Sequence, residues 1–169
     1  YRLSPELSDV LTEVAAETPV IVLQNLGLSW YPVWHYAVVV GYDLEREQII
    51  LRSGLEHRLV MPLSIFQRTW QRGGSWAMLA IPSDKLPATA TQEGYLTAVL
   101  ALEKNGKFAA AQAAYQTALN RWPEDLAALI GLGNTHYMLG NLNRAEQAFR
   151  KATTIHPESA VAYNNLAQS

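Results

Sequence analysis

Residues 34–43, WHYAVVVGYD, place one histidine at the start of an apolar run that ends in Gly-Tyr. An imidazole titrates near neutral pH, so His35 could serve as the general base for a nucleophile supplied by another segment. The simpler alternative is a hydrogen-bonded structural histidine at the entrance of a buried strand. The sequence around His35 must decide between these two roles.

Three side chains could bind a substrate beside this histidine, and they are Gln24, Asn25 and Trp34. The two amides end a neighbouring apolar run and could donate hydrogen bonds into a cleft. Their alternative role is to cap a loop. Trp34 could line a peptide groove together with Trp30 and Tyr31, but aromatic packing over a sheet would explain the same residues.

The other reactive residues of the sequence form no recognisable catalytic or metal-binding motif. The chain has no cysteine, which removes disulfides, thiolate metal sites and a cysteine nucleophile. His57, His136 and His156 show no metal-ligand spacing with one another or with carboxylates, and His136 is predicted to be a core residue. No phosphate-binding glycine loop is present. We therefore predict neither a metal nor a cofactor.

Composition narrows the classes of partner. The 169 residues carry a formal net charge of −2 without a Lys/Arg run, which argues against nucleic-acid binding. No apolar run reaches the roughly 18 residues of a membrane span. The chain opens with Tyr1 and no signal peptide, so we expect a fragment or a processed form. The cellular compartment cannot be read from it.

The first half, residues 1–84, changes its hydrophobic period often. A helical stripe follows Ser4-Pro5-Glu6, and strands are predicted at PVIVLQN, HYAVVVGY, QIILRS, HRLVM and WAMLAIP. The charged segment DLERE predicts a hairpin turn, and PLSIFQRTWQR predicts a short helix. This order indicates an α+β unit with an antiparallel sheet. Residues 85–91 are predicted to be a linker.

The second half repeats itself with a shift of 34 residues. Gly106 falls on Gly140, Tyr115 on Phe149, and Pro123 on Pro157. The pattern resembles the tetratricopeptide repeat, which implies an all-α solenoid of helix pairs over residues 92–169. The expected repeats are 92–125, 126–159 and the beginning of a third at 160–169.

The segment WHYAVVVGYDLEREQIILRSG resembles the His-bearing hairpin of papain-like cysteine peptidases, including the bacterial bacteriocin-processing (double-glycine) branch. The resemblance implies a partial papain-like sheet, with His35 as the catalytic base and Ser53 as the residue that orients its ring. A serine replaces the usual carboxylate or amide, and the nucleophilic cysteine with its segment is missing. The chain alone is therefore predicted to be inactive, although a bacterial, exported or periplasmic parent protein could be a peptidase.

Two acidic side chains near this hairpin could replace the missing orienting carboxylate. Asp43 is excluded because eight residues along a strand place it about 26 Å from His35. Glu56 could approach His35 if the hairpin register shifts by a few residues.

Stacked helix pairs leave a groove lined by the first helix of each repeat. The predicted lining is apolar and amide-bearing: Leu96, Leu100, Glu103, Ile130, Asn134, Tyr137 and Asn164. A peptide or protein segment is the expected ligand. The alternatives are a neighbouring domain or a second copy of the chain, because an uncapped third repeat favours self-association.

Two functions are consistent with these patterns. The first is the C-terminal half of a cysteine peptidase-like domain fused to a protein-binding repeat module, with the missing N-terminal half as a partner. The second is a non-catalytic interaction scaffold that carries a degenerate peptidase-like domain.

Overall fold

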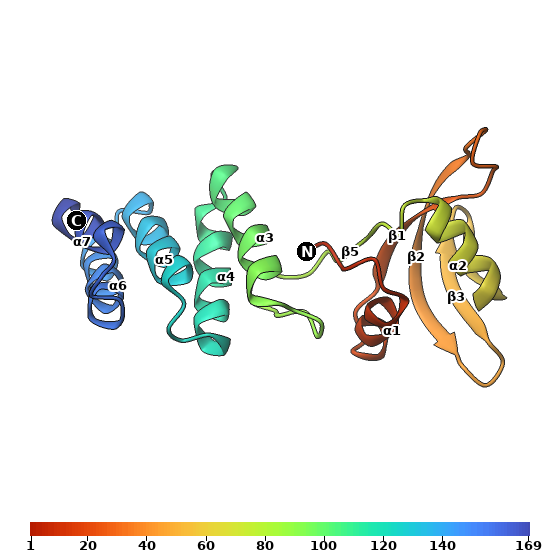
Figure 1. Ribbon diagram of the computed structural model, residues 1–169, viewed down its shortest axis with the longest axis horizontal. Helices are drawn as coiled ribbons and strands as arrows, with labels where there is room; N and C mark the ends of the chain where they lie inside the picture. The colour runs from red at the N-terminus through yellow and green to blue at the C-terminus, as the bar shows by residue number, and fades with distance from the viewer. The chain divides into compact units, whose positions relative to one another are not determined.

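The computed structural model describes residues 1–169, and the chain forms two compact units (Figure 1). The first unit comprises Tyr1–Ile81 and Pro87–Thr89, and the second comprises Pro82–Leu86 and Ala90–Ser169. Part of the segment predicted as a linker thus clusters with the first unit. Its Thr89 donates from the backbone N and from Oγ1 to the carboxylate of Glu13, at 2.7 and 2.6 Å.

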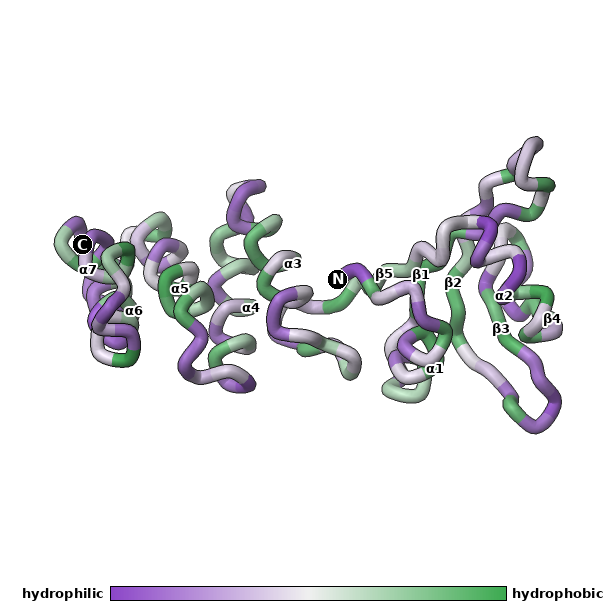
Figure 2. The backbone as a smooth tube through the Cα atoms, viewed as in Figure 1, coloured by the Kyte–Doolittle hydropathy of each residue, from purple (hydrophilic) through white to green (hydrophobic).

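The first unit is an antiparallel five-stranded sheet with two helices, which confirms the predicted α+β class. The strand order is β4-β3-β2-β1-β5. The elements are α1 (Leu7–Ala15), β1 (Val20–Asn25), β2 (Trp34–Asp43), β3 (Gln48–Ser53), β4 (Glu56–Pro62), α2 (Leu63–Arg72) and β5 (Ala77–Met78). Figure 2 shows the middle of β2 hydrophobic and the turn after β2 mostly hydrophilic, as expected for a buried hairpin with a solvated turn.

The last strand of the sheet is shorter than the sequence predicts. WAMLAIP was expected to form a strand throughout, but β5 contains only Ala77 and Met78. Beyond Met78, the backbone N of Leu79 donates to the carbonyl of Tyr1 at 2.7 Å. The segment thus leaves the β1 ladder and bonds to the N-terminal residues at the sheet edge.

Alternation along the strands puts one face of the sheet into a core. In the register of β1 and β2, Val20 pairs with Val39, Val22 with Ala37, and Gln24 with His35. The side chains of these three alternate pairs point to the same face of the sheet. His35 therefore lies at the edge of the buried face. The core cluster contains Leu3, Val10, Val20, Val22, Ala37, Val39, Ile49, Leu51, Phe66, Trp70, Ala77 and Leu79.

The second unit is all-helical, with helix starts spaced by 34 residues. Its helices are α3 (Gln92–Lys104), α4 (Phe108–Arg121), α5 (Leu126–Met138), α6 (Leu142–Ile155) and α7 (Ala160–Gln168). Each helix packs against the next one along the chain. The residues before α3, α5 and α7 are Thr91, Asp125 and Ser159, and each side chain accepts a hydrogen bond from the backbone N three residues later. The repeat period therefore also sets where these helices begin.

Candidate functional site

His35 and Ser53 meet at one end of the sheet. His35 is the second residue of β2, and Ser53 is the last residue of β3. The Nε2 atom of His35 lies 2.7 Å from Oγ of Ser53, and both side chains are half-buried. A histidine held in this way has a fixed ring orientation, which a general base needs. The catalytic roles of the two residues stay predictions.

The two carboxylates considered as partners for His35 do not reach it. Glu56 pairs with Ser53 across the β3–β4 ladder, but its exposed carboxylate forms no hydrogen bond or ion pair with His35. Asp43 lies at the opposite end of β2 and accepts a hydrogen bond from the backbone N of Arg46. The hydroxyl of Ser53 is therefore the side-chain group that holds the His35 ring.

Gln24 and Asn25 form internal hydrogen bonds rather than facing an open cleft. Both side chains are buried, and Nε2 of Gln24 donates to Oγ1 of Thr69 at 2.6 Å. Oδ1 of Asn25 accepts from the backbone N of Gly27 and Val33, at 3.0 and 2.9 Å. The Asn25 contacts match the loop-capping alternative, whereas Gln24 bonds to a side chain of α2. The substrate-binding role of the two amides stays a prediction.

The loop that Asn25 caps is a projecting hairpin, residues 26–33, which we call the aromatic arm. Leu28 and Tyr31 exchange two backbone hydrogen bonds of 3.1 Å across its tip. Gly27 is required there, because a Cβ at this position would lie 2.4 Å from the carbonyl oxygen of Tyr31. The arm extends beyond the sheet (Figure 1) and exposes 81% of Trp30. Packing of Trp30 over the sheet, one of the sequence-based alternatives, is therefore wrong.

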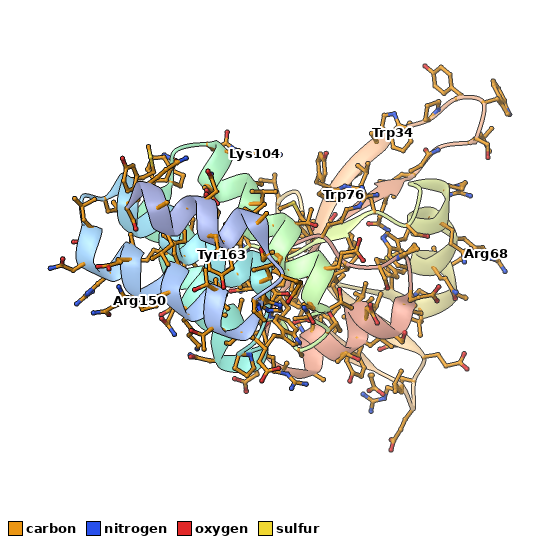
Figure 3. All side chains as sticks on the ribbon, turned by 60° about the vertical axis from the view of Figure 1, so that its left-hand side comes forward. Trp34, Arg68, Trp76, Lys104, Arg150 and Tyr163 are labelled. Carbon is orange, nitrogen blue, oxygen red and sulfur yellow. The ribbon has the colours of Figure 1, made fainter.

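Trp34 lies at the base of this arm (Figure 3) and is 57% exposed. Since β1 ends and β2 begins at the arm, while β3 ends and β4 begins at the turn 53–56, both loops lie at the same end of the sheet. Leu55 in that turn is 96% exposed. The His35–Ser53 pair is thus bordered by exposed apolar side chains, a surface that could contact a peptide.

A groove of about 630 Å³ runs along the first helices of the repeats in the second unit. We call it the repeat groove, and its lining is Glu93, Leu96, Thr97, Leu100, Glu103, Tyr115, Leu126, Ala127, Ile130, Gly131, Asn134, Ser159 and Val161. The structure brings together five of the residues proposed from sequence: Leu96, Leu100, Glu103, Ile130 and Asn134. Tyr137 lines an adjoining pocket of about 370 Å³. Asn164 on α7 lines neither, and its Oδ1 accepts a hydrogen bond from Nε2 of Gln168.

Sequence reasoning missed Tyr115, which belongs to the second helix of its repeat. Its ring reaches the groove because Gly131 has no side chain, since a Cβ there would lie 2.2 Å from Cζ of Tyr115. The Tyr115 hydroxyl donates to Oε2 of Glu103 at 2.7 Å. Burial raises the pKa of Tyr115 well above its ordinary value, and the hydrogen bond to Glu103 and its negative charge add to the shift. The hydroxyl therefore stays a donor at physiological pH.

His136 belongs to the core and not to the repeat groove. It is 7% exposed, and its Nδ1 has no hydrogen-bond partner. Burial lowers the pKa of His136, and the positive charge of Arg144 lowers it further. A neutral, buried imidazole agrees with the packing role predicted from the sequence.

The sequence model of the tetratricopeptide repeat family matches residues 96–160. This match covers α4, α5, α6 and most of α3, and it confirms the repeat part of the sequence-based prediction. No curated protein matches the chain. The resemblance of the first unit to papain-like peptidases stays a prediction. None of the helices combines the length and the apolarity that crossing a membrane would require.

Proposed function

We propose that the second unit binds an extended segment of another protein in the repeat groove. The observation that carries this proposal is the groove itself, about 630 Å³ in volume and lined by α3, α5 and the start of α7. Its apolar side chains can desolvate side chains of a ligand, and Asn134 offers an amide to a ligand backbone. The match of this region to tetratricopeptide repeats supports a protein-interaction module.

Binding in the repeat groove predicts that a charged side chain in the groove wall weakens peptide binding. Random peptides of about ten residues are selected by display against the full chain, and the affinities of the enriched peptides are measured by fluorescence anisotropy. Ile130→Lys places a long charged side chain in the apolar groove wall. We expect it to weaken binding at least about 10-fold, because the charge must be desolvated or the ligand displaced.

The matched control is Gln116→Lys, which adds the same side chain to an exposed position on α4 outside the repeat groove. It should leave affinity unchanged, and circular dichroism of both variants should show an intact fold. Equal binding by the wild type and Ile130→Lys would contradict a role of the repeat groove.

We further propose that the first unit is the histidine-bearing half of a papain-like cysteine peptidase site. The His35–Ser53 contact of 2.7 Å and the exposed aromatic arm at the same sheet end support this second function. The nucleophile must come from outside this chain, which contains no cysteine.

The chemistry of such a site assigns successive steps to His35. The imidazole takes the thiol proton, and the thiolate attacks a peptide carbonyl. The imidazolium then returns the proton to the leaving amine, which leaves an acyl-thioester for water to hydrolyse. Ser53 holds the His35 ring during these steps. The alternative function of the first unit is a non-catalytic scaffold, which requires none of these steps.

A thiol-labelling experiment distinguishes a peptidase function of the first unit from a non-catalytic scaffold function. The chain is isolated with its natural companions, its mass and those of co-purifying fragments are determined, and the mixture is treated with a peptide-like, thiol-reactive probe. If a cysteine fragment is present, His35→Gln should slow its labelling about 10- to 30-fold at pH 7. The reason is that an unassisted thiol of pKa about 8.5 is only a few per cent thiolate at that pH.

His57→Gln is the control, because His57 is an exposed histidine of the same unit. It should leave the labelling rate unchanged. The absence of both a cysteine fragment and any labelling would reject the peptidase function and leave the scaffold.

A further inference from the structure

The charged side chains of the repeat groove are all acidic. Glu93 and Glu103 line it, and no Lys or Arg side chain does. Both glutamates lie on α3, on the stripe that also carries Leu96 and Leu100, so they face the same ligand. Ten residues of helix separate them by about 15 Å. The groove therefore presents an apolar centre between two carboxylates.

The carboxylate of Glu103 is held in place by a hydrogen bond from Tyr115. Tyr115 donates its hydroxyl to Oε2 of Glu103, and Gly131 leaves the space that the Tyr115 ring occupies. Oε1 has no protein partner, and neither Glu103 nor Glu93 forms an ion pair. The nearest cation along the chain, Lys104, lines the adjoining pocket instead. A fixed carboxylate with one unused oxygen is a ready acceptor for a ligand cation.

We propose that the repeat groove selects an extended protein segment in which one apolar residue lies between two basic residues, in the order basic-x-apolar-x-basic. This inference rests on the proposed function of the second unit. Basic residues four positions apart in an extended chain point the same way and lie about 13 Å apart. Flexible Lys or Arg side chains can cover the small difference from the spacing of the glutamates. The apolar residue between them lies over Leu100 and Ile130.

Negatively charged ligands are disfavoured by the same arrangement of glutamates. A C-terminal carboxylate or an acidic segment would have to enter an apolar groove beside Glu93 and Glu103 without any Lys or Arg to pair with. Asn134 is an uncharged partner and cannot offset that repulsion. The charge of the ligand, and not only its apolar content, should therefore decide binding.

The test uses three synthetic peptides of one pattern on the full chain. The first is acetyl-Ser-Lys-Ser-Leu-Ser-Lys-Ser-amide, and the other two carry Gln or Glu in place of both lysines. At low ionic strength we expect the Lys peptide to bind about 5- to 20-fold more tightly than the Gln peptide, and the Glu peptide more weakly than both. Salt at about 0.5 M should remove most of that preference.

Variants assign the preference to the two glutamates. Glu103→Gln should lower affinity for the Lys peptide about 2- to 5-fold, and Glu93→Gln with Glu103→Gln should bring it to that of the Gln peptide. Tyr115→Phe keeps the ring and removes only the hydroxyl, so it should reproduce part of the Glu103→Gln effect. Glu146→Gln is the control, because Glu146 on α6 pairs with Arg150 and lies outside the repeat groove, and it should leave the affinity for the Lys peptide unchanged.

The outcomes separate the two levels of the proposal. Equal binding of the Lys and Gln peptides, with both still lost in Ile130→Lys, would overturn the charge selectivity while the proposed groove stands. If no peptide binds and display against the wild type enriches none, the proposed function fails as well. A Lys preference that survives the double Glu→Gln variant would place the selectivity elsewhere and overturn the inference.

Discussion

Replacing Trp70 by alanine is expected to lower the free energy of unfolding of the first unit by about 3–5 kcal/mol. Trp70 is 1% exposed on α2, its ring stacks on Phe66 with a centroid distance of 6.0 Å, and its Nε1 donates to the carbonyl of Trp76 at 2.9 Å. The substitution leaves a large cavity and removes one of the two hydrogen bonds that the Trp76 carbonyl accepts, the other coming from the backbone N of Leu23 at 3.1 Å. Hydrogen exchange read by mass spectrometry reports the two units separately and measures the effect.

Ile65→Ala on the same helix is the matched control, since Ile65 is 42% exposed. We expect it to cost less than about 1 kcal/mol. Equal effects of the two substitutions would show that α2 does not bury Trp70 in the core as described.

Replacing Gly133 by alanine should destabilise the second unit by about 1–3 kcal/mol, although alanine is the better helix former by about 1 kcal/mol. A Cβ at this position would lie 2.2 Å from Cε1 of Phe149 and 2.6 Å from Cδ1 and Cζ. Two packed helices must therefore separate, or the Phe149 ring must leave its position. Hydrogen exchange of the second unit, read by mass spectrometry, measures the loss.

A double-mutant cycle gives this prediction its control. Phe149→Leu removes ring atoms that the new methyl group would meet, so Gly133→Ala should be nearly neutral or stabilising in that background. Additive effects of the two substitutions would mean that the clash with Phe149 is not the cause.

The period of the sequence was sufficient to predict the helices and most strands. Short runs of apolar, often β-branched residues predicted β1 to β4, and the 34-residue shift predicted the five repeat helices. The length of β5 could not be predicted. Whether Leu79 continues the strand depends on the distant N-terminal residues to which it bonds, and no local pattern records that partner.

The candidate sites were predictable only in part. The first-helix stripe Leu96, Leu100 and Glu103 follows from helical spacing, but Tyr115 reaches the groove through space left by Gly131 on another helix. The local sequence around Asn25 is the same whether its amide caps the aromatic arm or faces a cleft. The role of Asn25 depends on the loop that folds back over it, because the backbone N atoms of Gly27 and Val33 bond to its Oδ1.

Binding in the repeat groove is tested most directly by a map of the methyl chemical-shift changes that occur when a display-selected peptide is added to the full chain. We expect the methyl groups of Leu96, Leu100 and Ile130 to shift and to saturate together, and we expect Ile130→Lys to weaken the affinity at least about 10-fold. Shifts confined to the first unit, or to the side of the repeats formed by α4 and α6, would contradict binding in the repeat groove.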